Sequence, residues 1–127
     1  MSGVGCGSCR ACVNACPNGA IRDNRTIDTR RCISCRTIER GAEGDTTPLH
    51  GWIFGCDACQ SVCPFNQHAP LHTNPKFDPI VDPTALSVEG LSTMSEECFA
   101  QLVGHTAMMR AGLVRLQHNA KRNAEDR

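Results

Sequence analysis

The stretch that decides the fold is Cys6-Gly-Ser-Cys9-Arg-Ala-Cys12-Val-Asn-Ala-Cys16-Pro17. A shorter copy of the same spacing returns as Cys56-Asp-Ala-Cys59-Gln-Ser-Val-Cys63-Pro64, with Ile53 at the place that corresponds to Cys6. All but one of the ten cysteines lie between residues 6 and 63 of the 127-residue chain. We therefore expect whatever the sulfur atoms bind to hold the N-terminal half together, because cysteine at this density is typical of a cysteine-held scaffold.

Three kinds of sulfur site remain open at this point: disulfides, zinc and iron–sulfur clusters. Disulfides need an oxidising compartment, but residues 1–5 show neither the basic region nor the apolar region of a secretory signal. No apolar stretch approaches the length of a membrane span, so no membrane contact is expected. These observations favour a cytoplasmic, metal-held chain.

The cysteine spacing favours iron–sulfur clusters over zinc. The run C-x2-C-x2-C-x3-C-P supplies three ligands to one [4Fe-4S] cluster, and its fourth cysteine ligates the neighbouring cluster. The first predicted ligand set is Cys6, Cys9, Cys12 and Cys63, and the second contains Cys16, Cys56 and Cys59. The fourth ligand of the second cluster stays open between Cys32 and Cys35. A zinc site needs two separated pairs, which Cys32/Cys35 and Cys56/Cys59 could supply but the triple run does not match.

Local structure around the cysteines follows from the same run. A short helix starting near Cys12 is expected to carry Cys16 toward the second cluster, and Pro17 is expected to end it. The glycines 5, 7, 19 and 55 are expected to let backbone N–H groups approach the sulfur atoms, where such donors tune a cluster.

The predicted fold class is small α+β: a loop-rich, ferredoxin-like dicluster [4Fe-4S] domain with a C-terminal helix pair. The predicted domains are residues 1–69 for the dicluster ferredoxin-type domain, 70–90 for an extended, proline-rich linker, and 91–127 for a helical extension. Within the first domain, residues 40–51 are expected to form an exposed loop.

Two helices are predicted in the extension. Ser95 is a good N-cap for a helix that Gly104 ends, with Cys98 expected as a buried apolar thiol. The second helix is predicted over residues 107–122, since Met109, Leu113, Leu116 and Ala120 fall on one helical face. Trp52 and Phe54 are expected to cover a cluster.

The charges give a mixed signal. Thirteen Lys and Arg residues balance thirteen Asp and Glu residues, so no net field indicates nucleic acid or membrane. Six arginines nevertheless lie between residues 22 and 40: Arg22, Arg25, Arg30, Arg31, Arg36 and Arg40. They either offset the negative charge of two clusters or contact RNA phosphates, and both interpretations stay open.

Four stretches together resemble the epoxyqueuosine reductase family. They are the run from Cys6 to Ile21, Arg31-Cys-Ile-Ser34, Trp52-Ile-Phe-Gly-Cys-Asp-Ala-Cys-Gln-Ser-Val-Cys-Pro-Phe-Asn66, and Arg110-Ala-Gly-Leu-Val-Arg-Leu-Gln-His-Asn119. The run from Gly55 to Asn66 is the specific part, because many ferredoxins share the first stretch. The resemblance covers roughly residues 5–122, and only the C-terminal iron–sulfur part of the family's protein.

The resemblance implies an oxidoreductase that reduces epoxyqueuosine in tRNA to queuosine with cobalamin and two [4Fe-4S] clusters. The clusters would relay electrons to cobalamin from an external donor such as ferredoxin or flavodoxin, and the arginine-rich segments would contact tRNA. The resemblance also implies Cys32 as the fourth ligand of the second cluster, with Cys35 a departure from the family.

The family's N-terminal cobalamin region has no counterpart here. Cobalamin is therefore expected mainly outside this chain, and no catalytic residue can be transferred to it. We expect a fragment that is inactive alone. Two alternatives are a stand-alone two-cluster ferredoxin and a fragment of another cobalamin/iron–sulfur reductase, such as a reductive dehalogenase. The arginines and the C-terminal helices disfavour the first alternative, and the Gly55–Asn66 stretch disfavours the second.

Overall fold

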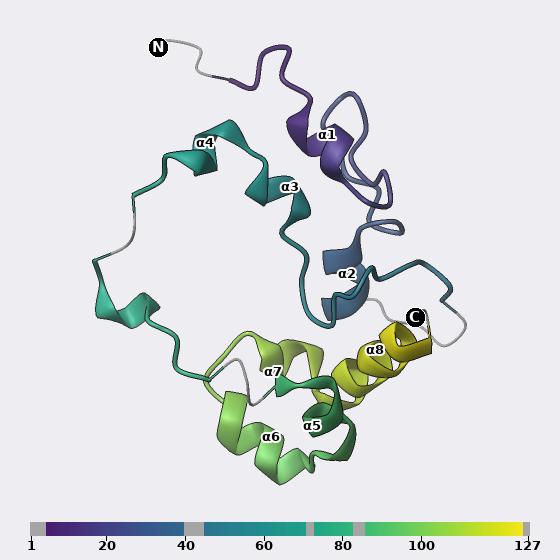
Figure 1. The fold of residues 1–127 in the computed structure, drawn as a ribbon, viewed down its shortest axis with the longest axis vertical. Coiled ribbons are helices and arrows are strands. Elements are labelled where there is room, and N and C mark those ends of the chain that lie inside the picture. Colours follow the sequence, from purple (N-terminus) through teal and green to yellow (C-terminus); the bar gives the residue numbers. More distant parts are fainter. Residues whose placement is uncertain (1–4, 40–44, 71–72, 83–85, 126–127) are drawn as a thin grey trace.

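A computed structural model describes residues 5–39, 45–70, 73–82 and 86–125. The cysteine-rich half carries helices α1 (Ala11–Ala15), α2 (Ile33–Ile38) and α3 (Ala58–Ser61). An arm follows, with α4 (Pro64–Gln67) and the 3-10 helix η1 (Pro75–Phe77). The chain ends in a helical layer of α5 (Val88–Thr93), α6 (Glu96–Val103), α7 (Met108–Ala111) and α8 (Leu113–Glu125). Figure 1 shows this layer below the cysteine-rich half, with the arm looping out between them.

Short helices and turns dominate the cysteine-rich half. Helix α1 ends where Cys16 becomes extended, directly before Pro17, as predicted. Ile21 and Ile27 form one isolated antiparallel bridge, and the described residues contain no longer strand. The bridge does not extend because the chain turns again at once, with the Arg31 N–H donating to the Asp28 carbonyl. The expected α+β character is therefore not confirmed for the described part of the chain.

Serine side chains begin two helices of the lower layer. Ser87 Oγ accepts the Gly90 N–H at 3.0 Å, and Ser95 Oγ accepts the Cys98 N–H at 3.2 Å. The predicted helix after Ser95 is confirmed. The prediction that Cys98 is buried is wrong: its side chain is exposed, because the buried face of α6 is formed by the next residue, Phe99, and by Val103.

The second predicted helix, over residues 107–122, is in fact two helices. Gly112 has φ +76°, a left-handed conformation that favours glycine, and its N–H bonds to the Met108 carbonyl, so α7 ends there and α8 starts anew. Because of the break, Met109 does not lie on the buried face and is 43% exposed. Leu113 and Leu116 are buried, as predicted.

The helical layer packs against the cysteine-rich half and not only against itself. Its core contains Leu91, Phe99, Val103, Ala111, Leu113 and Leu116. Helix α8 packs on α5 and also on α2, which carries the Cys32/Cys35 segment. Phe54, two residues before Cys56, is partly buried and packs against this helical core.

Two predicted boundaries meet the structure only in part. Helix α5 begins at Val88, inside the predicted linker over 70–90, and η1 interrupts the extended path. Residues 71–72 and 83–85 of that linker lie outside the described residues. Residues 40–44 of the expected exposed loop also lie outside the described residues. The expectation of exposure is wrong for Leu49, which is 1% exposed.

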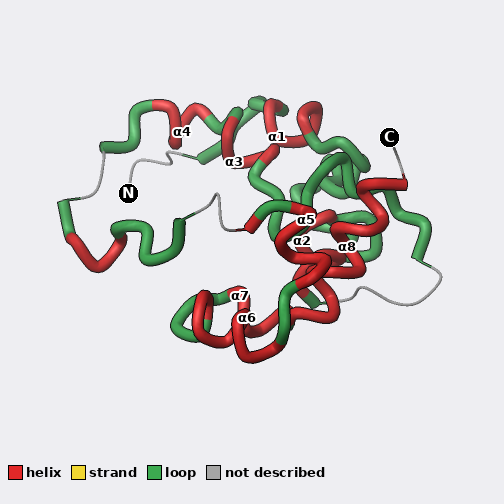
Figure 2. Tube along the Cα trace, turned by 60° about the horizontal axis from the view of Figure 1, so that its bottom comes forward, coloured by secondary structure: helices red, strands yellow, loops and turns green. Residues whose placement is uncertain are grey.

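The arm leaves apolar side chains uncovered. Phe65, Phe77 and Ile80 are 55%, 70% and 69% exposed. Figure 2 shows the arm standing apart from the layer of α5–α8. Within the described residues, no helix combines the length and apolarity needed to traverse a bilayer.

Candidate metal centre

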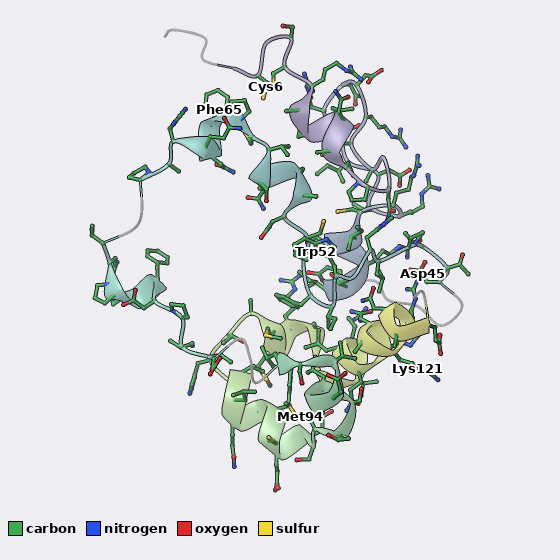
Figure 3. All side chains as sticks on the ribbon, in the orientation of Figure 1. Cys6, Asp45, Trp52, Phe65, Met94 and Lys121 are labelled. Atoms are coloured by element: carbon green, nitrogen blue, oxygen red, sulfur yellow. The ribbon has the colours of Figure 1, made fainter. Side chains whose placement is uncertain are left out.

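Three cysteines of the first motif and one cysteine from the second motif line one cavity. The cavity has a volume of about 220 Å³, and its walls include the first cysteine set, which is Cys6, Cys9, Cys12 and Cys63. Cys6 and Cys9 are exposed, whereas Cys12 and Cys63 are half-buried. Phe65 also lines this cavity, and Figure 3 shows Cys6 and Phe65 at the same end of the molecule. These are the four residues that the spacing assigns to one cluster.

Backbone geometry explains how this set comes together. The Cys9 N–H bonds to the Cys6 carbonyl at 2.9 Å, a turn that passes through Gly7 at φ +49°. Cys12 lies on α1. Cys63 is the N-cap of α4, and α3, just before it, packs against α1. The packing of the two short helices therefore delivers Cys63 to the first motif.

Electrostatic effects on one thiol link the members of the second cysteine set, which is Cys16, Cys32, Cys56 and Cys59. Burial raises the pKa of the Cys59 thiol, and the nearby sulfurs of Cys56, Cys16 and Cys32 raise it further. Such coupling requires the four groups to lie close together. Cys16 also accepts the Ala20 N–H at 3.2 Å on its sulfur, the kind of donor expected beside Gly19.

Cys35 and Cys98 lie apart from both sets in different ways. Cys35 is on α2, one turn beyond Cys32, and is not among the three sulfurs that raise the pKa of Cys59. Cys98 is exposed on α6, in the lower layer. The choice between Cys32 and Cys35 as the fourth ligand of the second set therefore stays a prediction.

The donor set fits two clusters better than the alternatives. All ten cysteines lie in the described part of the chain and all are free, so disulfides are not formed. A tetrahedral zinc ion would hold sulfurs about 3.8 Å apart, given zinc–sulfur bonds near 2.3 Å. Among the described residues, no three His, Cys, Asp or Glu side chains are arranged to bind a single ion. Cysteines spread around a cavity match the larger cubane that thiolates hold.

Polar residues from α2 and α8 surround the loop that leads to Cys56. Thr37 is fully buried, and its Oγ1 accepts the Gly55 N–H at 3.0 Å. Asn119 and Asn123 on α8 bond to the backbone of residues 51–53. The sequence prediction missed these three residues. Asparagines on the apolar side of the α8 pattern were the available signal, because a polar side chain in a buried stripe must find partners.

The arginines are partly engaged within the chain. Arg22 and Arg30 both pair with Asp28, and a side-chain hydrogen bond from Arg30 lowers the pKa of that carboxyl. Arg25 donates to the Cys9 carbonyl and so braces the first cysteine set. Arg36 pairs with the largely buried Asp45.

Comparison with known proteins first defines a class. Residues 5–66 match the family of 4Fe-4S double cluster binding domains, the segment that contains both cysteine sets.

The second comparison concerns longer relatives. Epoxyqueuosine reductase from Synechococcus sp. (strain RCC307) is 39% identical over 109 residues, covering 83% of this chain and 33% of the relative. That from Escherichia coli (strain K12) is 42% identical over 118 residues, covering 91% and 31%. A crystal structure of epoxyqueuosine reductase with an epoxyqueuosine-modified tRNA-Tyr stem loop is 32% identical, with a TM-score of 0.79, over 93% of this chain and 32% of that one.

These matches confirm the resemblance to epoxyqueuosine reductases that the motifs predicted. The chain is similar to their iron–sulfur part along nearly its whole length, and it spans about a third of the length of these relatives.

Proposed function

We propose that this chain is the iron–sulfur electron-relay portion of an epoxyqueuosine reductase. The observation that carries the proposal is the convergence of Cys6, Cys9, Cys12 and Cys63, from both copies of the motif, on one cavity. The match of residues 5–66 to a double cluster binding domain supports it. The longer relatives supply the reaction class, an oxidoreductase step on epoxyqueuosine.

The proposed ligands follow the two sets. Cys6, Cys9, Cys12 and Cys63 would hold the first [4Fe-4S] cluster, and Cys16, Cys32, Cys56 and Cys59 the second. The clusters would accept and pass on single electrons. The fold would keep the two ligand sets adjacent through the packing of α1 on α3, and it would direct the Ala20 N–H at the Cys16 sulfur.

The remaining features of this function are also proposals. Cobalamin would be bound mainly outside this chain, in the region that the longer relatives possess, and electrons would come from a ferredoxin or flavodoxin. We assign a cytoplasmic location, since ten free cysteines fit a reducing compartment. We keep the division into a ferredoxin-like domain (1–69), a linker (70–90) and a helical extension (91–127).

Anaerobic reconstitution of the chain tests the core of this proposal. Two [4Fe-4S] clusters predict about eight irons and eight sulfides per chain. A measured content of about four irons and four sulfides per chain would contradict the second cluster. The chain alone is expected not to reduce epoxyqueuosine in tRNA. Turnover by the isolated chain would show that the active site has been misplaced.

Contact with tRNA is the finer part of the proposal. One relative's structure contains a tRNA stem loop, and the side chains of Arg22 and Arg30 are 60% and 73% exposed beside the first motif. Replacing Arg30 and Arg31 with Ala should weaken tRNA binding and flatten its salt dependence, because each phosphate contact releases counterions. Unchanged binding and salt dependence would assign these arginines to charge compensation for the clusters instead.

A further inference from the structure

The loop before Cys56 is held in an unusual backbone conformation. His50, Gly51 and Gly55 have φ values of +51°, +84° and +71°, three left-handed residues within six positions. The two glycines adopt this conformation without steric cost, whereas His50 needs the surrounding structure to hold it there. Because Cys56 follows Gly55 directly, whatever holds this loop also sets the position of the Cys56 sulfur.

Two asparagines of α8 hold the loop. The Asn119 amide donates to the Ile53 carbonyl at 2.9 Å and to the Thr37 carbonyl at 3.1 Å. The Asn123 amide donates to the Trp52 carbonyl at 2.9 Å, while its oxygen accepts the Gly51 N–H at 2.9 Å. The two side chains are only 1% and 7% exposed, so these bonds form away from water.

The bonds of Asn119 join two segments that each carry a cysteine of the second set. Thr37 lies on α2, whose N-cap is Cys32, and Ile53 lies three residues before Cys56. Thr37 closes the arrangement, because its Oγ1 accepts the Gly55 N–H at 3.0 Å while donating to the Ile33 carbonyl at 2.9 Å. One amide of α8 therefore links the Cys32 helix to the Cys56 loop.

We infer that Asn119 and Asn123 are positioning residues for the second cluster. In this view α8 is a clamp that fixes the spacing of Cys32 and Cys56 before iron binds, and the first cluster does not depend on it. The inference rests on the proposed function, since it takes the two cysteine sets as ligands. It goes beyond that function by giving the C-terminal helix a role in assembling one cluster of the two.

The same helix provides a matched control. Gln117 on α8 also donates two hydrogen bonds to backbone carbonyls, to Leu91 at 2.9 Å and to Met94 at 3.2 Å. Those carbonyls belong to the α5 segment, away from the cysteines. A loss of two bonds from α8 can therefore be compared at the clamp and away from it.

The experiment reconstitutes the full 127-residue chain anaerobically as wild type, Asn119→Leu and Gln117→Met. Asn119→Leu keeps the branched outline of the side chain, Gln117→Met keeps roughly its length, and each removes two hydrogen bonds. Iron is counted, and unprotected thiols are alkylated with iodoacetamide and mapped by mass spectrometry. Wild type and Gln117→Met should retain both clusters. Asn119→Leu should lose about half of the iron, and Cys16, Cys32, Cys56 and Cys59 should react about tenfold faster or more. The first set should stay protected.

A milder variant covers the case in which Asn119→Leu fails to fold. Thr37→Val keeps the outline of the side chain and removes both the acceptor for the Gly55 N–H and the donor to the Ile33 carbonyl within α2. Because only the first of these bonds reaches the Cys56 loop, Cys56 should become several-fold more reactive while iron is retained. Full protection of Cys56 in both variants would overturn the clamp. Equal loss of both clusters in Asn119→Leu and Gln117→Met would also overturn the clamp, because it would mean that the two substitutions only lower the overall stability of the chain. If the second set were unprotected in the wild-type chain, the two-cluster proposal itself would be overturned. This result distinguishes failure of the proposed function from failure of the clamp alone.

Discussion

The two cysteine sets are built from the same short motif but sit in different surroundings. Cys6 and Cys9 of the first set are exposed, and the Cys9 carbonyl accepts a hydrogen bond from the half-buried Arg25. The second set lies beside α2 and α8, where buried Thr37, Asn119 and Asn123 fix the backbone around it. The motif therefore specifies the sulfur spacing, while the packed surroundings decide how firmly the backbone of each site is held.

The strongest way to break this comparison is to remove an exchanged ligand. Cys63→Ala should abolish the first cluster and leave the second, although Cys63 belongs by sequence to the second motif. Cys16→Ala should do the reverse. Each variant should retain about four irons per chain, and alkylation mapping should show which set has become reactive. If Cys63→Ala exposed Cys56 and Cys59 instead, the assignment of the two sets would be wrong.

The next largest effect separates Cys32 from Cys35. Cys32→Ala should remove the second cluster, because the resemblance to epoxyqueuosine reductases assigns Cys32 as its fourth ligand. Cys35→Ala should keep about eight irons. Iron analysis and the absorbance of the reconstituted variants measure the difference. The opposite result would make Cys35 the fourth ligand.

A core substitution sharpens the link between the helical layer and the second set. Leu116 is fully buried in the core of that layer, so Leu116→Ala should cost about 2–5 kcal/mol of unfolding free energy by leaving a cavity. Denaturant melts of the reconstituted chain measure the cost. Val114→Ala is the control, because Val114 is on the same helix and 72% exposed. Comparable losses from both variants would contradict the observed packing.

The two clusters should also differ, by a smaller amount, in how fast oxygen destroys them. Because Cys6 and Cys9 are exposed, the first cluster should bleach faster in air than the second. The measurement is alkylation of the two sets at successive times after exposure. Equal rates, or earlier loss from the second set, would mean that the burial of the thiols does not control access of oxygen to the clusters.

The smallest expected effect comes from the turn beside the first motif. A hydrogen bond from Arg30 lowers the pKa of Asp28, so the ionised carboxylate stabilises the folded state at neutral pH. This contribution is present above the ordinary carboxyl pKa near 3.9 and is lost as pH falls toward the lowered value. Asp28→Asn should therefore be less stable than wild type at pH 7, with the gap closing in acid. A gap independent of pH would assign the effect to shape instead of charge.

Much of the site could be predicted from sequence, because ligand spacing is a local property. Cys6, Cys9 and Cys12 are tied by the short run itself, and the exchange of Cys63 follows from the ferredoxin rule. The choice of Cys32 needed the family resemblance. The asparagine clamp could not be predicted, since its partners are backbone groups more than 60 positions away.

The fold was harder to predict than the site. The helix starting after Ser95 was predictable because its cap and first turn lie next to each other in sequence. The break at Gly112 was missed because the apolar periodicity continues across it, and only the φ of +76° reveals it. The α+β expectation carried over from ferredoxins, whereas the described residues have only the Ile21–Ile27 bridge.

The seating of Cys63 beside Cys6, Cys9 and Cys12 has a consequence for biosynthesis. Cys12 is translated about fifty residues before Cys63, so under the proposed ligand assignment the first set would stay one sulfur short until the second motif has been made. Until then an assembly factor would find at the first motif three thiols of one proposed set and a single thiol, Cys16, of the other. Maturation of either centre is thus tied to synthesis of the second motif, and a ribosome that stalls between the motifs leaves both centres empty.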